Sequence, residues 1–182
     1  ANPKNPKNPE IAGQIFSEWS NFSTWLLPHN VFHLKLAAGY HNKNENLYQA
    51  KFYFGGFGNR EVENVDVKQY RKVFRFPGIP IYSISADQFV KIMIENNFPP
   101  IRFGNISLWS HLLNHIDFSI YTQSMVLKTE QDNRWIDIGG QINFIFKHWY
   151  NLESTFSAGI AKAWSEKSNS WEWFLSLKLL KN

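Results

Sequence analysis

The chain has 182 residues and a mass of 21.4 kDa, which suits one domain with a sizeable core. Lys and Arg total 19 against 15 Asp and Glu, so the net charge of +4 is too small to indicate nucleic-acid binding. The chain contains no Cys, which excludes disulfides and thiolate metal ligands. No apolar run reaches about 18 residues, which excludes a transmembrane helix.

Aromatic residues make up 17% of the chain, although charged residues reach 19% and the mean hydropathy is -0.38. Many large rings within a polar average indicate segments with one apolar and one polar face. The strands of a transmembrane β-barrel alternate in this way, and they also average to a polar hydropathy. Composition therefore leaves a membrane barrel open.

The N-terminal residues 1–14 carry a proline at every third position from Pro3 to Pro9. This spacing favours an extended, polyproline-like conformation without a packed face. We expect a Pro/Asn-rich linker or turn over 1–14 and barrel strands over 15–182.

The first clear alternation of apolar and polar side chains runs from Val31 to Tyr40. The alternation resumes from Tyr48 to Phe54, after the polar residues 42–46. Two alternating segments joined by a short polar turn predict a β-hairpin.

Residues 55–84 interrupt the alternation and form a connection of about 30 residues, a length that is usually functional or covered by other structure. This stretch carries most of the basic residues and ends in the turn-forming run 76–80. Its basic residues include Arg60, Lys68, Arg71, Lys72 and Arg75.

Alternation returns in five later segments, at 90–98, 116–123, 136–146, 156–164 and 171–179. The stretch 101–113 fits either a strand or a helical spacing. The chain thus contains seven or eight predicted strands of about ten residues, the length that crosses a bilayer when tilted.

One face of these segments is polar and the other is almost wholly Ile, Phe, Leu and Trp, which indicates a barrel with an aqueous interior and a lipid-facing exterior. We predict that the lipid-facing residues are Ile138, Ile142, Phe144, Phe156, Ile160, Trp173, Leu175 and Leu177. Aromatic residues near strand ends suit the girdles of a membrane interface: Tyr40, Trp135, Trp149, Tyr150, Trp164 and Trp171. The alternative is a soluble sandwich or lipocalin-like barrel with an aromatic core.

Several short motifs occur in order: 54–60 (FGGFGNR), 68–71 (KQYR), 74–78 (FRFPG), Glu95 with the Pro99-Pro100 turn, and 176–180 (SLKLL). Through them, residues 30–182 resemble the C-terminal transmembrane β-barrel of bacterial outer-membrane proteins in the BamA-like surface-antigen superfamily. They are also similar to barrels that follow periplasmic propeller domains. The resemblance implies an antiparallel transmembrane β-barrel, either the C-terminal half of a larger barrel or a small closed barrel of about eight strands.

The resemblance also implies that the long loop folds back into the barrel lumen. Arg75 and the loop motif Phe76, Pro77 and Gly78 would then lie inside that lumen. Glu95 lies on the polar face of its predicted strand, so its carboxylate should point into the same lumen. We therefore predict a bidentate pair between Arg75 and Glu95. The alternative is that both are solvated in a wide aqueous pore.

Other groups of residues are weaker indications of a functional site. The glycines at 55, 56 and 58 lack the spacing and the following Gly-Lys-Ser/Thr of a phosphate loop, and no Gly-x-Ser-x-Gly elbow occurs. His111 and His115 are four residues apart near Asp117, but the glutamate of a zinc-protease motif is absent. We expect no metal site, and an enzyme with these three residues at its active site is the weakest hypothesis.

Together these observations predict an integral outer-membrane barrel of a Gram-negative bacterium with a role in insertion, transport or anchoring, without catalysis or a cofactor. Its expected partners are outer-membrane lipid and, as further candidates, other outer-membrane or periplasmic proteins, with no nucleic acid. The alternative function is a soluble all-β barrel or sandwich that binds a hydrophobic or carbohydrate ligand.

Overall fold

The computed structural model describes residues 12–24, 27–41, 51–57, 73–108, 111–128, 134–147 and 153–179. These residues are mostly β-strand, and their strands pair antiparallel throughout. The described residues contain no helix that could span a membrane. The predicted all-β, antiparallel fold class is confirmed.

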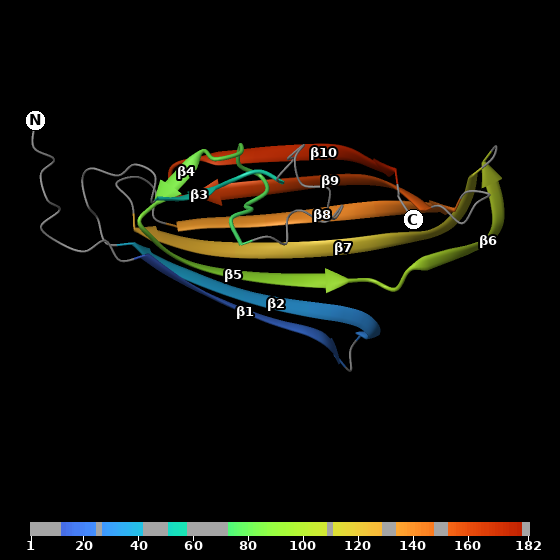
Figure 1. The fold of residues 1–182 in the computed structure, drawn as a ribbon, viewed down its shortest axis with the longest axis horizontal. Coiled ribbons are helices and arrows are strands. Elements are labelled where there is room, and N and C mark those ends of the chain that lie inside the picture. The colour runs from blue at the N-terminus through green and yellow to red at the C-terminus, as the bar shows by residue number, and fades with distance from the viewer. Residues whose placement is uncertain are drawn as a thin grey trace, which may run out of the picture.

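The main sheet is a meander of long strands, drawn from β10 to β1 in Figure 1. Its path follows β1 (Ala12–Thr24), β2 (Leu27–His41), β5 (Gln88–Asn97), β7 (His111–Lys128), β8 (Arg134–Lys147), β9 (Glu153–Ser165) and β10 (Asn169–Leu179). Among the described strands, β1 and β10 are the two ends of this path and do not pair with each other. Closure of the sheet into a barrel therefore stays a prediction.

The ambiguous stretch 101–113 is strand, comprising β6 (Ile101–Leu108) and the start of β7. β5 pairs with residues 119–128 of β7 and β6 with residues 111–116, so β5 and β6 form one interrupted line along β7. The interruption falls at Pro99 and Pro100, which have no N–H to donate to a ladder. Beyond it, β6 bends away at the right of Figure 1.

The predicted hairpin between 31–40 and 48–54 is wrong. β2 pairs with β1 and β5, while the short β3 (Phe52–Phe54) pairs with β4 (Ile84–Ala86) in a separate two-stranded sheet. A polar turn between two alternating segments is typical of a hairpin, but the next described strand after β2 belongs to the separate sheet.

No separate alternating segment is identified at β1, although most of β1 falls in the region 15–182 that is expected to hold strands. The strand begins at Ala12, inside the expected linker 1–14. Its alternation is imperfect, because Phe16 occupies the same face as Glu18. Residues 1–11 lie outside the described part of the chain.

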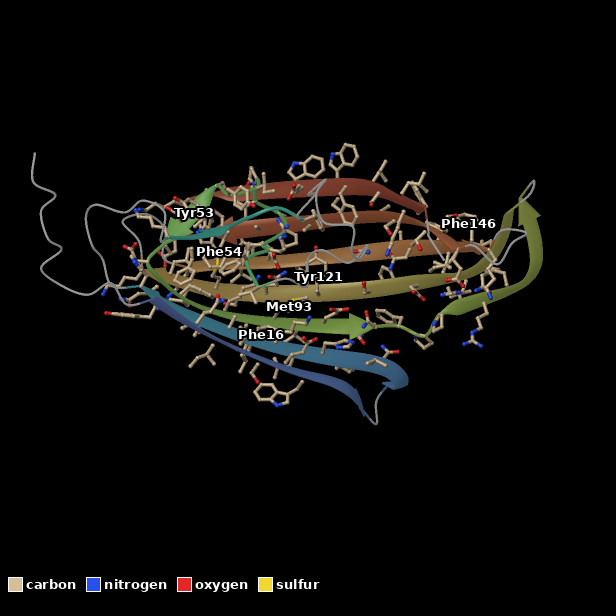
Figure 2. The ribbon with its side chains drawn as sticks, in the orientation of Figure 1. Phe16, Tyr53, Phe54, Met93, Tyr121 and Phe146 are labelled. Carbon is tan, nitrogen blue, oxygen red and sulfur yellow. The ribbon has the colours of Figure 1, made fainter. Side chains whose placement is uncertain are left out.

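Residues 51–57 and 73–86, together called the inserted segment, pack against one face of the main sheet. A cluster of buried apolar residues joins the two: Phe54, Phe76, Ile79 and Ile84 from the inserted segment, and Phe89, Met125, Leu127, Trp135 and Ala163 from the sheet. The rings of Phe54 and Phe89 meet edge to face with centroids 4.9 Å apart. Figure 2 shows Phe54, Met93 and Tyr121 over the middle strands. Trp135 is thus a core residue, and its predicted place in an exposed aromatic girdle is wrong.

The close packing of this face predicts a severe effect of added volume at Gly139. A Cβ there would lie 2.3 Å from the hydroxyl oxygen of Tyr121 and 2.9 Å from the Cβ of Ala161. We expect Gly139→Val to lower the free energy of unfolding by about 1–3 kcal/mol, as measured by urea denaturation. The control is Gly13→Val, since a Cβ at Gly13 meets no atom within 4 Å. Equal stability of the two variants would contradict this packing.

Candidate functional site

The two faces of the main sheet carry different side chains, because successive side chains of a strand point to opposite sides. The face covered by the inserted segment, called the inner face, carries buried polar side chains. These are Lys91, Glu95, Ser119, Gln123, Asp137, Gln141, Asn143 and Ser157. Cross-strand register aligns them, with Gln123 opposite Asp137 and Ser119 opposite Gln141.

The opposite, outer face is apolar and exposed. Its exposed residues include Ile15, Val90, Ile94, Ile120, Val126, Ile138, Ile160, Trp164, Trp171, Trp173, Leu175 and Leu177. Trp173 is 60% exposed and Leu177 is 63% exposed, values that large apolar side chains of a soluble core do not reach. The buried inner face is therefore mixed, because these polar side chains lie beside the apolar cluster around Phe89, Met125 and Trp135, whereas the outer face is exposed and mostly apolar.

Lys91 of β5 holds one end of the inserted segment. Its ammonium donates hydrogen bonds to the carbonyl oxygens of Val73, at 3.0 Å, and Arg75. The same nitrogen lies 5.6 Å from the ring centroid of Phe76. Because Lys91 is 4% exposed, these contacts replace water around a buried cation.

Glu172 of β10 lies beside the segment on the same face, at the edge of the sheet that β10 forms. The backbone N–H groups of Phe57 and Gly78 act on its carboxylate, although Oε2 has no hydrogen-bond partner among the described residues. The ring of Phe57 packs on that of Phe174, with centroids 4.4 Å apart. The inserted segment therefore spans the inner face from β5 to β10.

Gly78 allows the segment to approach the sheet closely. Its φ of 89° is a backbone conformation that side chains disfavour, and a Cβ would lie 2.6 Å from the backbone nitrogen of Ala163. Gly56 also has a positive φ, of 72°, and its N–H donates to the carbonyl of Ile79 at 2.7 Å. The two glycines thus serve tight turns and close packing.

Charges of both signs gather around Lys91. Asp137 is its attractive neighbour, while Lys35 and Arg75 are repulsive ones. Lys35 in turn pairs with Glu18 at 3.0 Å. Such a mixed cluster is stable in a low-dielectric interior only if its members compensate one another.

Farther along the inner face, the side-chain oxygen of Asn143 accepts hydrogen bonds from Gln141 at 2.6 Å and Ser157 at 2.8 Å. Both carboxylate oxygens of Asp137 and the amide of Gln123 find no hydrogen-bond partner among the described residues. Buried polar groups require such partners, from water or from the rest of the chain.

The structure buries the predicted loop and pair residues. Arg75 is 8% exposed and Glu95 is fully buried, and Phe76, Pro77 and Gly78 are buried with them. The loop residues reach the inner face on which Glu95 also lies. Contact between the guanidinium of Arg75 and the carboxylate of Glu95 stays a prediction. Residues 58–72, with the other predicted basic positions, lie outside the described part of the chain.

The eight predicted lipid-facing residues all occupy the outer face. Ile138, Ile160, Trp173, Leu175 and Leu177 are exposed. Ile142, Phe144 and Phe156 are half-buried, with the rings of the two phenylalanines 6.1 Å apart. Lipid contact itself stays a prediction. Among the expected girdle residues, Tyr40, Trp164 and Trp171 are exposed, whereas Trp149 and Tyr150 lie outside the described residues.

Sequence reasoning missed the role of Lys91, which is one polar residue of the alternating segment 90–98. A signal was present, since Lys91 and Glu95 are four residues apart on one strand and therefore share a face. Its actual ligands are backbone carbonyls of a distant segment, which no spacing reveals.

The histidine constellation gives no metal-ligating cluster among the described residues. The Nε2 atom of His115 lies 3.7 Å from Oδ1 of Asp117. The side chain of His111 lies outside the described part of the structure. Comparisons with protein-family models, curated proteins and solved structures found no match.

Removing the Lys91 ammonium should loosen the inserted segment. We expect Lys91→Met to raise the rate of tryptic cleavage after Arg75 by roughly tenfold or more, because hydrogen bonds to a buried cation are lost. Cleavage is measured by mass spectrometry on the folded protein. Lys128→Met, at the exposed end of β7, is the control. Unchanged cleavage in both variants would show that Lys91 does not hold the segment.

The Arg75 and Glu95 pairing is tested by a double-mutant cycle on the free energy of unfolding. For Arg75→Ala with Glu95→Ala we expect a coupling energy above about 1 kcal/mol, since each single change leaves a buried charge without its partner. A coupling energy indistinguishable from zero would reject the pairing.

Proposed function

We propose that the chain forms part of a transmembrane β-barrel in a bacterial outer membrane, with a role in insertion, transport or anchoring and without catalysis. One observation carries the proposal: polar residues are buried beneath the inserted segment on the inner face, while large apolar residues are exposed on the outer face. Water disfavours an exposed apolar face of this size, whereas lipid against the outer face and a lumen that contains polar groups fit this arrangement.

Strand length supports the same function. β2 has 15 residues, β8 has 14 and β10 has 11. A tilted strand needs about 9–11 residues to cross the hydrocarbon core. Strands of soluble proteins have a mode of about 5–6 residues, so these exceed that length and suffice for a membrane crossing.

Aromatic residues at one end of the sheet also support it. Tyr40 lies near the end of β2, Trp164 near the end of β9 and Trp171 near the start of β10, and all three are exposed. The antiparallel register brings these strand ends to the same end of the sheet. A girdle of amphipathic rings is typical of a membrane–water interface.

The inserted segment narrows the possible roles. By covering the inner face from Lys91 to Glu172, it would occupy the lumen of the barrel. A transport role would then require displacement of this segment, whereas anchoring would use it as a permanent brace. Tryptic cleavage after Arg75 in the presence and absence of a candidate cargo would separate these two roles.

The alternative, a soluble module that binds a hydrophobic ligand, has one observation in its favour. An apolar hollow of about 570 Å³ lies on the outer face between β1, β2, β5 and β7, lined by Ile15, Ala38, Val90 and Val126. A ligand of that size would leave most of the exposed apolar face uncovered. A membrane environment covers the whole face and is therefore the stronger explanation.

The membrane proposal predicts a depth-dependent penalty for charge on the outer face. We expect Leu175→Arg to lower the free energy of unfolding in lipid vesicles by about 2–4 kcal/mol, as for a cation near the bilayer midplane. Glu166→Arg, in the exposed turn between β9 and β10, should change it by less than about 0.5 kcal/mol. A wild-type chain that is monodisperse without detergent and does not associate with vesicles would overturn the proposal.

A further inference from the structure

A second hollow lies on the outer face over β7, β8, β9 and β10, with a volume of about 500 Å³. Gly140 forms its floor, where a Cβ would meet nothing closer than 3.5 Å, so the space above the backbone is open. The hollow is lined by Ile120, Ile138, Ile160, Trp171 and Lys162. Ile120, Gly140 and Ile160 stand opposite one another in cross-strand register.

Lys162 is the cation in this apolar surface. Its register partners are Ile138 on β8 and Trp171 on β10, and its side chain is exposed. Within the described part of the chain it makes no ion pair or hydrogen bond. An ammonium on a lipid-facing surface is costly unless it reaches an anion or water.

The positions of these residues along the strands match the order of the headgroup and the acyl chain in a lipid. Lys162 lies three residues before the end of β9 at Ser165, in the row that contains Trp171. Gly140 and Ile160 lie one outer-face row farther from that end. A cation nearer the interface and an apolar hollow nearer the middle of the strands fit a headgroup and an acyl chain in that order.

We propose that this hollow is a binding site for an anionic glycerophospholipid, with its phosphate at the Lys162 ammonium and one acyl chain over Gly140. The inference rests on the proposed membrane location. Charge complementarity selects an anionic headgroup over a zwitterionic one, because a net negative charge is needed to balance the lone ammonium. If Lys162 only extends to the interface, its effect on lipid affinity is independent of Gly140. If the two residues contact one lipid molecule, the effects of substituting them depend on each other.

The experiment uses native mass spectrometry of the full chain in non-ionic detergent. Phosphatidylglycerol and phosphatidylcholine with identical acyl chains are titrated separately. We expect one phosphatidylglycerol to bind preferentially, and Lys162→Gln to weaken its binding by about fivefold and remove the preference. Gly140→Leu, which fills the hollow, should weaken both lipids. The double variant should lose no more phosphatidylglycerol affinity than the more affected single variant.

Two further variants control for folding and for general charge. Lys162→Arg should keep the preference, because it retains the cation. Lys147→Gln should leave lipid binding unchanged, because that exposed lysine already has Glu153 as a partner at 4.0 Å.

Three outcomes would overturn the inference. If the chain inserts into vesicles but Lys162→Gln and Gly140→Leu bind phosphatidylglycerol like the parent, this site is rejected while the membrane proposal stands. If Gly140→Leu converts a dimer to a monomer without changing lipid binding, the hollow is a contact between copies. If the chain fails to enter vesicles at all, the membrane proposal and this inference fail together.

Discussion

The strict alternation of side chains along strands in fixed register is the constraint on which the rest of the structure depends. Across β7 and β8, the register places Asp117 opposite Asn143 and Gln123 opposite Asp137 on the inner face, and Phe118 opposite Ile142 on the outer face. A slip of one residue would carry Asp137 to the outer face and Ile138 beneath the inserted segment. The inner face contains both the buried polar groups and the apolar cluster that contacts the inserted segment, and the outer face contains the exposed apolar side chains, so the contents of both faces select a single register.

The inner face and the inserted segment stabilise each other. Two ionisable groups of the sheet face backbone groups of the segment: Lys91 donates hydrogen bonds to carbonyl oxygens, and the carboxylate of Glu172 faces backbone N–H groups. Outside β3 and β4, the segment has backbone groups that no ladder of its own satisfies. Conversely, without the segment both side chains would need other partners. The apolar contacts of Phe54 and Phe76 stabilise the packing but are not directional. The polar contacts therefore determine the position of the segment on the sheet.

The later strands could be predicted from sequence because their alternation is long and local, as in β5, β8 and β10. β1 could not, since Phe16 breaks its pattern. The hairpin of 31–54 was wrongly predicted because the true partner of β3 is β4, about 30 residues away, and the partners of β2 are likewise set by tertiary packing. Alternation could also place Glu95 and Asp137 on one face. It could not identify Lys91 as the residue that binds the inserted segment, since its partners are main-chain groups whose position depends on the whole fold.

The edges of the sheet place a final constraint on how a membrane-spanning form can close. Hydrocarbon cannot satisfy the outward N–H and C=O groups of β1 and β10, so further strands must pair with both edges. The path from β1 to β10 has seven strands, each antiparallel to the next, so β1 and β10 run in the same direction. Joining them directly would create a parallel pair, which bacterial barrels with antiparallel strands avoid. An all-antiparallel closure therefore needs an odd number of added strands: one makes a barrel of eight, and any larger odd number makes a larger barrel with an even total. The same parity holds whether those strands come from the same polypeptide or from a partner, because it follows only from the directions of the two edges.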